Sequence, residues 1–379
     1  MPKQKIVYII SNINKALEFE WVATYLNKDK FDLSFILLNP VKGTELSKFV
    51  QTQGLIVEEL IYRSKKDLFS SILKVIKILK KTRPEIVHTH LPEATLIGLL
   101  VGKVLGIKSR IYTRHHSTFN YDYHPHAIKY DLFANWLATD IVAITQNVKK
   151  ILTDREGVEN DKVTVIPHCI DIERFDSVTE EEINGLKSKY NIKSSSRFVV
   201  GVISRYTEWK GIQYIIPAFK KLLKEEPNAL LIISGGKGGE YKNEIQTLLK
   251  ELPSKNYLEI EFENNLFALY KLFDVFVHAP VDQYCEAFGQ IYIETMAAKV
   301  PSIVTRSGIG VDILKDNKNA LVVDYKNSEE IYSALQSLLV EDKGLKKQII
   351  SEANQMVRKE FYIKKKIDLL ESLYIRNYS

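Results

Sequence analysis

The sequence predicts an α/β protein built from two parallel-sheet domains, and three observations support this fold class. Short runs rich in Val and Ile alternate with amphipathic segments along most of the chain. These runs are continuously apolar, which is typical of parallel strands covered by helices on both faces. A polar stretch at residues 176–197 interrupts the alternation once, and the pattern restarts at residue 198. A length of 379 residues also fits two domains better than one.

The N-terminal half is predicted to contain seven strands with helices between them. The first run, KIVYII, is rich in the residue types that favour strands. The segment DLFSSILKVIKILKK has the apolar spacing of an amphipathic helix, and Pro84 follows it. The expected helices are residues 16–27, 67–81, 95–106 and 127–138. The expected strands are residues 5–10, 31–39, 54–61, 85–90, 110–116, 141–145 and 162–168.

The C-terminal half repeats this organisation after the polar stretch, which is predicted to be a linker. Ligands of open α/β sheets bind beyond the carboxyl ends of the strands, so the main site is expected in a cleft between two facing domains. The expected helices are residues 212–227, 241–252, 288–299, 328–340 and 343–359. The expected strands are residues 198–204, 229–236, 257–262, 274–280, 301–308 and 320–325.

Composition excludes several classes of protein. An apolar fraction of 45% with 26% charged residues excludes an intrinsically disordered chain. No run of about 18 apolar residues is present, so no transmembrane helix is expected. The N-terminus lacks the apolar region and cleavage site of a secretory signal. With only Cys169 and Cys285, a disulfide framework is excluded, and a reducing, cytoplasmic setting is expected.

The excess positive charge lies entirely in the N-terminal half. Residues 1–175 contain 25 Lys and Arg against 19 Asp and Glu, which accounts for the net charge of +6 of the whole chain. An acidic or membrane-bound partner would suit this half, whereas no nucleic-acid-binding motif accompanies the modest charge.

The expected helix at 67–81 has two interpretations. Its basic residues, with those just after it, are Lys74, Lys77, Lys80, Lys81 and Arg83. Its apolar stripe consists of Leu68, Ile72, Val75, Ile76 and Leu79. The favoured interpretation is the solvated face of a helix that covers a sheet. The alternative is a helix that lies on the anionic inner leaflet of a membrane.

The strongest motif is EAFGQIYIE at residues 286–294. Gly289 is expected at the start of a helix, where the N–H groups of Gly289, Gln290 and Ile291 could hold a phosphate. Glu286 and Glu294 flank this helix start, and carboxylates accept hydrogen bonds from sugar hydroxyls. Two ordinary helix-end carboxylates would explain the spacing equally well.

A second motif is GVISRYTEWKG at residues 201–211. Arg205 follows the first expected strand of the second half, and Lys210 comes five residues later. Two cations at the end of a strand can clamp a diphosphate, although exposed basic loop residues are common.

Six of the eight histidines lie between residues 88 and 126. A metal site is not expected there, because no carboxylate or cysteine stands at ligand spacing. The segment TRHH ends a strand, so His115 or His116 is predicted to point into the cleft. A neutral imidazole at that place could donate to a sugar hydroxyl.

These motifs occur in register with two further segments. KVTVIPHCIDIERF at residues 162–175 looks like a "VIPNGID…F" join, and KVPSIVTRSGIGVDIL at 299–314 looks like a "G-x-P-V-I-x-T…G-G…E" segment. Together the five features resemble family 4 of the retaining glycosyltransferases, over nearly the whole chain. The resemblance implies the GT-B architecture, in which two Rossmann-like domains face each other across a cleft.

The resemblance also implies roles for the residues of these motifs. A nucleotide-sugar, with UDP favoured as the nucleotide, would bind the C-terminal domain, where Arg205 and Lys210 neutralise the diphosphate. Glu294 would bind the ribose, and Glu286 with Phe288 would hold the donor sugar. His115 would act with Glu286 at the reacting sugar. No metal or other cofactor is expected, because the cations and the helix N-terminus stabilise the leaving group.

Domain limits and acceptor residues follow from the same resemblance. The N-terminal domain is expected at 1–175 and the nucleotide-sugar domain at 198–355, with helix 356–379 crossing back to the first domain. A saccharide or lipid-linked saccharide acceptor would bind the N-terminal domain near Glu20, His116 and Tyr121. The segment at 11–21 departs from the family because it contains no glycine where many relatives have a Gly-Gly-x-Glu loop.

Two other functions fit the same fold. A nucleotide-sugar epimerase would convert its donor without an acceptor, and a GT-B-like binding protein would have no activity at all. The presence of Glu286, Glu294, Arg205 and Lys210 argues against the binding protein.

Overall fold

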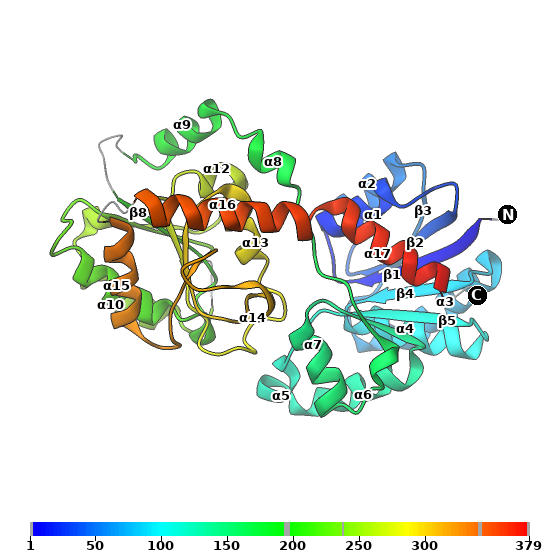
Figure 1. Ribbon diagram of the computed structural model, residues 1–379. Coiled ribbons are helices and arrows are strands. Elements are labelled where there is room, and N and C mark those ends of the chain that lie inside the picture. Colours follow the sequence, from blue (N-terminus) through cyan, green and yellow to red (C-terminus); the bar gives the residue numbers. More distant parts are fainter. Residues whose placement is uncertain (1–2, 193–197, 237–238, 340–342, 377–379) are drawn as a thin grey trace. The chain divides into compact units, whose positions relative to one another are not determined.

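The structure is a computed structural model that describes residues 3–192, 198–236, 239–339 and 343–376 (Figure 1). The chain forms two compact units. Unit 1 comprises Met1–Cys169 and Ile363–Ser379, and unit 2 comprises Ile170–Tyr362. Both units contain a parallel β-sheet with helices, so the predicted α/β class with two Rossmann-like domains is confirmed.

The sheet of unit 1 has seven parallel strands in the order β3-β2-β1-β4-β5-β6-β7. The order reverses between β1 and β4, which makes this position the topological switch point of the unit. The strands are β1 (Gln4–Ser11), β2 (Phe31–Asn39), β3 (Ile56–Ile61), β4 (Ile86–His90), β5 (Ser109–Arg114), β6 (Asp140–Ala143) and β7 (Val163–Val165).

Helices cover both faces of this sheet. Successive residues of β1 point to opposite faces, so Ile6 and Tyr8 enter one core while Val7 and Ile9 enter the other. The main helices are α1 (Leu17–Tyr25), α2 (Glu45–Thr52), α3 (Leu68–Thr82), α4 (Pro92–Val104), α5 (Phe119–Tyr123), α6 (Ile128–Leu137), α7 (Gln146–Lys150) and α17 (Ile363–Arg376). Short 3-10 turns, η1 (Lys65–Asp67) and η2 (Pro125–Ala127), precede α3 and α6.

The sheet of unit 2 has six parallel strands in the order β10-β9-β8-β11-β12-β13, and its switch point lies between β8 and β11. The strands are β8 (Val199–Ile203), β9 (Leu230–Ser234), β10 (Tyr257–Ile260), β11 (Val275–His278), β12 (Ser302–Val304) and β13 (Leu321–Val322). The helices are α8 (Ile172–Asp176), α9 (Glu180–Lys189), α10 (Ile212–Leu222), α11 (Lys242–Leu249), α12 (Leu266–Tyr270), α13 (Gln290–Ala298), α14 (Ile309–Ile313), α15 (Ser328–Leu339) and α16 (Lys343–Glu360).

The expected linker contains a helix. Thr179 and Glu182 form a capping box at the start of α9, in which each side chain accepts from the other residue's backbone N–H. This helix belongs to unit 2, and the division between the units falls between Cys169 and Ile170. Residues 193–197 of the expected linker lie outside the described part of the chain.

The C-terminal segment divides into two helices. Helix α16 packs against α13 in unit 2, and α17 belongs to unit 1. Within unit 1, Ile367, Leu370 and Tyr374 of α17 are buried in the same core as Ile6 and Tyr8 of β1. None of the described helices is long and apolar enough to cross a membrane.

Candidate active site

The predicted donor residues of unit 2 follow the two strands at its switch point. Arg205 comes after β8, and Lys210 ends the short 3-10 turn η5 (Glu208–Lys210). Glu286 lies in the loop between β11 and α13, and β11 is the direct neighbour of β8. Because parallel strands end at the same edge of a sheet, these side chains gather where ligands of such sheets bind.

A buried ion-pair cluster surrounds Glu286. Lys210 Nζ donates to Glu286 Oε1, and His278 Nε2 lies 3.2 Å from the same oxygen. Burial would raise the pKa of Glu286, but the Lys210 ammonium and the His278 ring lower it to about 2. Burial also lowers the pKa of His278. The Glu286 carboxylate is therefore ionised at neutral pH.

Arg205 differs from Lys210 because its side chain is exposed and has no ion-pair partner among the residues that the structure describes. Lys210 is held close to β11 by the next residue. Gly211 has a φ of 72°, and a Cβ there would lie 1.7 Å from the carbonyl oxygen of Ala279. Only glycine permits this approach, so the turn brings Lys210 to the Glu286 loop.

Helix α13 begins at the predicted place. Gly289 precedes it with a φ of 79°, and Gln290 and Ile291 are its first two residues. The backbone at Gly308 packs closely against the loop that precedes α13. A Cβ at Gly308 would lie 2.6 Å from the carbonyl oxygen of Phe288. The positive end of the α13 dipole therefore lies beside Glu286, as an anion-binding site requires.

Glu294 and Phe288 each have a defined environment. Tyr270 OH donates to Glu294 Oε2 at 2.7 Å, and burial raises the pKa of Glu294. Tyr270 itself is fully buried, so the hydrogen bond fixes one oxygen of the carboxylate. The ring of Phe288 is also buried, and it packs edge-on against Phe361 at 6.3 Å.

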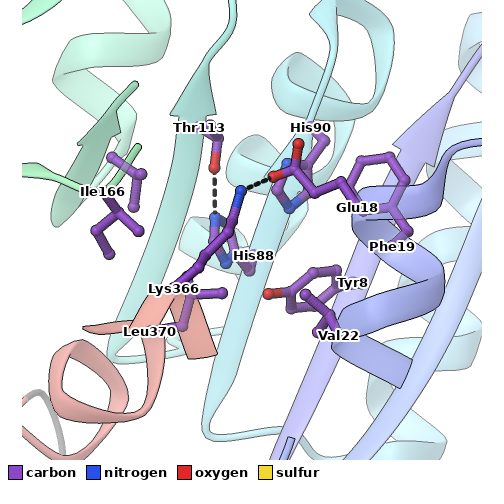
Figure 2. A pocket seen from close by; sticks show the side chains of 11 residues that line it. Tyr8, Glu18, Phe19, Val22, His88, His90, Thr113, Ile166, Lys366 and Leu370 are labelled. Carbon is purple, nitrogen blue, oxygen red and sulfur yellow. Dashed lines mark hydrogen bonds and ion pairs between the residues drawn. The ribbon is translucent and has the colours of Figure 1, made fainter. Parts of the chain in front are cut away.

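His115 of unit 1 belongs to a chain of histidines at the carboxyl ends of β4 and β5, and Figure 2 shows its two buried members, His88 and His90. His115 Nε2 lies 3.2 Å from His90 Nδ1, and the rings of His90 and His88 stack at 4.4 Å. His88 bonds Thr113 and Tyr374 through its two nitrogens. Burial lowers the pKa of His115 and of His88 to about 3, so both rings are neutral at neutral pH.

A charged cluster adjoins these histidines. Glu18 on α1 accepts from Lys366 on α17 (Figure 2), and His168 Nδ1 lies 2.6 Å from the other oxygen of the Glu18 carboxylate. The His168 ring stacks on His115 with centroids 5.7 Å apart. Burial would raise the pKa of Glu18, but His168 and Lys366 hold it well below its usual range.

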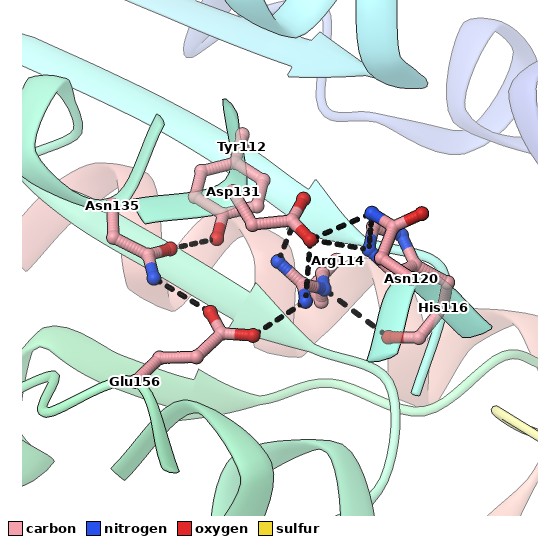
Figure 3. A network of polar contacts seen from close by, with 7 residues as sticks. All are labelled: Tyr112, Arg114, His116, Asn120, Asp131, Asn135 and Glu156. Atoms are coloured by element: carbon pink, nitrogen blue, oxygen red, sulfur yellow. Dashed lines mark hydrogen bonds and ion pairs between the residues drawn. The ribbon is translucent and has the colours of Figure 1, made fainter. Parts of the chain in front are cut away.

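His116 belongs to a second network, centred on the buried Arg114 (Figure 3). Arg114 forms ion pairs with Asp131 at 3.1 Å and with Glu156 at 2.6 Å. His116 Nε2 lies 3.2 Å from Asp131, and Asn120 donates to the same carboxylate. His115 and His116, which are adjacent in the sequence after β5, therefore belong to two separate networks.

Of the other expected acceptor residues, Tyr121 borders the Arg114 network, whose charges act on its pKa, and Glu20 forms none of its described contacts with either network. Glu20 on α1 is partly buried, and burial raises its pKa with the Glu45 charge adding to the effect. Tyr121 on α5 lies under the Arg155 guanidinium, 5.7 Å from its ring centroid. Glu18, rather than Glu20, is the α1 glutamate that meets the histidine cluster.

Sequence reasoning missed five of the residues that build these sites: Glu18, Arg114, His278, Tyr270 and Lys366. The signal for His278 and Arg114 was available, because each is the last residue of a strand at a ligand-binding edge. No local signal marks Lys366. In the described part of the chain, no group of three or more His, Cys, Asp or Glu side chains could hold a metal ion.

Two family models match this chain, one in each half. Residues 22–174 match Glycosyltransferase Family 4, and residues 186–356 match Glycosyl transferases group 1. The chain therefore belongs to the glycosyltransferases of GT-B architecture. The predicted resemblance to this class is confirmed.

Individual relatives extend over most of the chain. CapM of Staphylococcus aureus, a capsular polysaccharide biosynthesis glycosyltransferase, is 26% identical over 388 residues, covering 99% of this chain and 97% of CapM. The UDP-Gal:alpha-D-GlcNAc-diphosphoundecaprenol alpha-1,3-galactosyltransferase of Escherichia coli is 24% identical over 314 residues, covering 80% of this chain and 79% of that enzyme.

A solved structure supports the fold. Alr3699/HepE of Anabaena, crystallised in complex with UDP and glucose, has a TM-score of 0.80 at 16% identity, covering 98% of this chain and 99% of that one.

Proposed function

We propose that this chain transfers a hexose or N-acetylhexosamine from a nucleotide sugar, with UDP favoured, to a saccharide or lipid-linked saccharide. The reaction serves the synthesis of a cell-surface polysaccharide or glycolipid and retains the anomeric configuration. The observation that supports this proposal best is the group formed by Arg205, Lys210, Glu286 and the α13 N-terminus at the switch point of unit 2.

The proposed chemistry centres on the donor diphosphate. The bond from the anomeric carbon to the diphosphate oxygen breaks, and a bond to the acceptor oxygen forms on the same face. The acceptor proton passes to the departing phosphate oxygen, so no separate base is needed. Arg205 supplies an uncommitted cation for the charge that develops on this leaving group, and Lys210 and the N–H groups of Gly289, Gln290 and Ile291 support it. This arrangement requires no metal ion.

The remaining donor contacts follow the same logic. The ionised Glu286 accepts from hydroxyls of the donor sugar, and Phe288 contributes its backbone because its ring is buried. Glu294 accepts from the ribose hydroxyls in the orientation fixed by Tyr270. The neutral ring of His115 provides a hydrogen bond to the donor sugar. The UDP and glucose of the Anabaena protein support the choice of donor, and the lipid diphosphate in the name of the Escherichia coli enzyme supports a lipid-linked acceptor.

A panel of nucleotides tests the donor assignment. UDP, GDP and ADP, each without metal, are added to the protein and the midpoint of thermal unfolding is measured. We expect UDP to raise the midpoint most, because a ligand at a hundredfold excess over its Kd stabilises the fold by about 2.7 kcal/mol. Radiolabelled sugar transfer from the UDP-sugar that binds then tests the reaction, and conversion of that donor without an acceptor would identify an epimerase instead.

We further propose that the protein works at the inner face of the membrane and contacts it through residues 67–83. Val75 and Leu79 of α3 are buried in the unit 1 core, whereas Phe69 and Leu73 are 72% and 52% exposed. Exposed apolar side chains beside lysines suit an anionic lipid surface.

Sedimentation with vesicles of anionic phospholipid tests this contact. We expect binding at low salt that weakens as salt rises, because screening shortens the reach of exposed charges. Changing the exposed Lys74 and Lys77 to Glu should abolish it, whereas the same change at the exposed Lys224 and Lys250 should not. No binding of the wild-type chain to vesicles at low salt would refute the proposal.

A further inference from the structure

We propose that unit 1 contains a pocket for the lipid part of the acceptor, an apolar chain attached to a phosphate or diphosphate. The inference rests on the proposed function and narrows its acceptor to a lipid-linked one. It starts from a cavity of about 780 Å³ at the carboxyl edge of the unit 1 sheet, beside the β1–β4 switch point. A cavity of this size is in the range of ligand sites.

The wall of the cavity is mainly apolar. Helix α4 packs against both α3 and α6, and the cavity lies over the start of α4 between these two neighbours. Its apolar side chains come from several separate segments and include Tyr62, Leu68, Leu91, Leu96, Phe119 and Tyr130. Leu68, Leu91 and Leu96 give the wall an aliphatic part that a saccharide alone would not need, since sugars bind through hydroxyl groups and aromatic faces.

The apolar surface continues out of the cavity on both sides. Leu68 and Phe69 at the start of α3 are 41% and 72% exposed, and Phe119 and Tyr130 on the other side are 46% and 44% exposed. Exposed apolar groups in such a cluster are typical of surfaces that meet a lipid or a partner. A chain that leaves the cavity would remain in contact with apolar side chains.

Charge distinguishes a lipid with an anionic head from other apolar ligands. Arg63 and Lys65 line the cavity at η1, and neither forms an ion pair with any residue that the structure describes. The third cation of the wall, Arg114, is neutralised by Asp131 and Glu156 (Figure 3).

The remaining carboxylate of the wall is Glu93. It accepts from Asn12 and Ser11 at 3.1 and 3.3 Å, on the side of β1. At η1, Asp67 accepts from the backbone N–H groups of Arg63 and Ser64. The three cations Arg63, Lys65 and Lys66 lie beside this single carboxylate, so the net charge there is positive and would attract the phosphate of a lipid head group.

A soluble lipid diphosphate tests the assignment. Binding of farnesyl diphosphate, inorganic diphosphate and farnesol is measured by calorimetry, with saturating UDP present so that the donor site is occupied. We expect farnesyl diphosphate to bind at least tenfold more tightly than either fragment. Equal affinity for farnesyl diphosphate and inorganic diphosphate would overturn the proposal.

Matched variants locate the site. Leu68→Asp introduces a charge at the exposed first residue of α3, where a carboxylate favours the helix, and should weaken farnesyl diphosphate binding at least tenfold. Leu73→Asp on the same helix lies outside the cavity and should leave binding unchanged.

A second pair of variants tests the cations at η1. Arg63→Gln with Lys65→Gln should remove the preference for farnesyl diphosphate over farnesol, whereas Lys66→Gln should retain it. Equal effects in the test and control variants would place the lipid elsewhere.

Two readouts separate this inference from the proposed function. Suppose that the wild-type protein binds UDP and transfers sugar but binds farnesyl diphosphate no more tightly than inorganic diphosphate or farnesol. That result would support the proposed function and refute the lipid pocket. If the protein binds no nucleotide, the proposed function is refuted, whatever the result with farnesyl diphosphate. In the active enzyme, Leu68→Asp should raise KM for a lipid-linked acceptor at least tenfold and leave KM for the donor unchanged.

Discussion

Lys210 keeps the buried carboxylate of Glu286 ionised. Changing Lys210 to Met removes the closest cation to Glu286 and one of the two proposed diphosphate ligands. Losing one preorganised electrostatic contact to a leaving group costs about 100-fold in turnover or more. We therefore expect kcat of the Lys210→Met variant to fall at least that far, with a smaller loss of UDP affinity. Lys220→Met, which breaks an exposed pair with Glu251, is the control and should keep wild-type kinetics.

The hydrogen bond from Tyr270 to Glu294 makes a second prediction at this scale. Tyr270→Phe keeps the buried ring and removes only the hydroxyl that orients the carboxylate. We expect UDP affinity to fall by about tenfold, the effect of one hydrogen bond to a charged group, with kcat at saturating donor unchanged. Glu294→Ala should weaken UDP more strongly. The control is Tyr332→Phe, whose hydroxyl donates to the exposed Glu225. A Tyr270→Phe variant with wild-type UDP affinity would show that Glu294 does not bind the nucleotide.

Among the elements, α17 packs on unit 1 through apolar side chains and also carries one buried charge. Lys366 is 6% exposed and pairs with Glu18 on α1. Removing one partner of a buried ion pair costs about 3–5 kcal/mol, because the other charge is left uncompensated. Lys366→Met should lower the free energy of unfolding of unit 1 by this amount in urea titrations. Adding Glu18→Gln should recover part of the loss, which a simple packing defect would not allow.

The exposed pair of Lys364 and Asp368 on the same helix provides the control for that variant. Lys364→Met should change the stability by less than about 0.5 kcal/mol, since exposed pairs one turn apart contribute little. Equal losses from both lysine variants would contradict the role assigned to burial.

The elements also show how far the sequence could predict this structure. All the expected strands are present, because most of them are short runs rich in apolar and β-branched residues, a signal that is local in the sequence. Helices α2 and α9 were not predicted, since α2 is only 8 residues long, α9 is mostly polar, and their caps at Thr44 and Thr179 are short signals. The helix expected from residue 95 begins at Pro92, the first residue of α4, where the missing N–H of proline costs nothing.

The sites were predictable only where the motif was local. The residues of the 201–211 and 286–294 motifs come together in unit 2 because β8 and β11 are neighbours in the sheet. The choice between Glu18 and Glu20 could not be made in this way. It depends on Lys366, which is 348 positions away and reaches α1 only after α17 has packed on the sheet.

The two units should differ in their resistance to acid. Burial lowers the pKa of three unit 1 histidines, His88, His90 and His115, and of one in unit 2, His278, among the groups described. From about pH 6.5 down to 3, the unfolded chain therefore binds more protons than the folded one, and the free energy of unfolding falls as pH falls. For His88, with a pKa of about 3, the loss between pH 7 and 5 is about 2 kcal/mol.

Tryptophan fluorescence can follow each unit separately. Trp21 and Trp136 lie in unit 1, and Trp209 lies in unit 2. In acid titrations of the Trp209→Phe variant and of the Trp21→Phe/Trp136→Phe variant, we expect the unit 1 signal to change at the higher pH. The exposed His124 offers a control, since His124→Gln should leave both transitions in place. Loss of the unit 2 signal first would contradict the prediction.

The path of the chain through the two units has a consequence for its biosynthesis. Residues 1–169 leave the ribosome before any part of unit 2, yet the core face on which α17 packs is still uncovered at that stage. Unit 2 is translated in full before α17 emerges. The unit begun first is therefore the last to be completed, and in the interval Ile6, Tyr8 and their neighbours are available to chaperones.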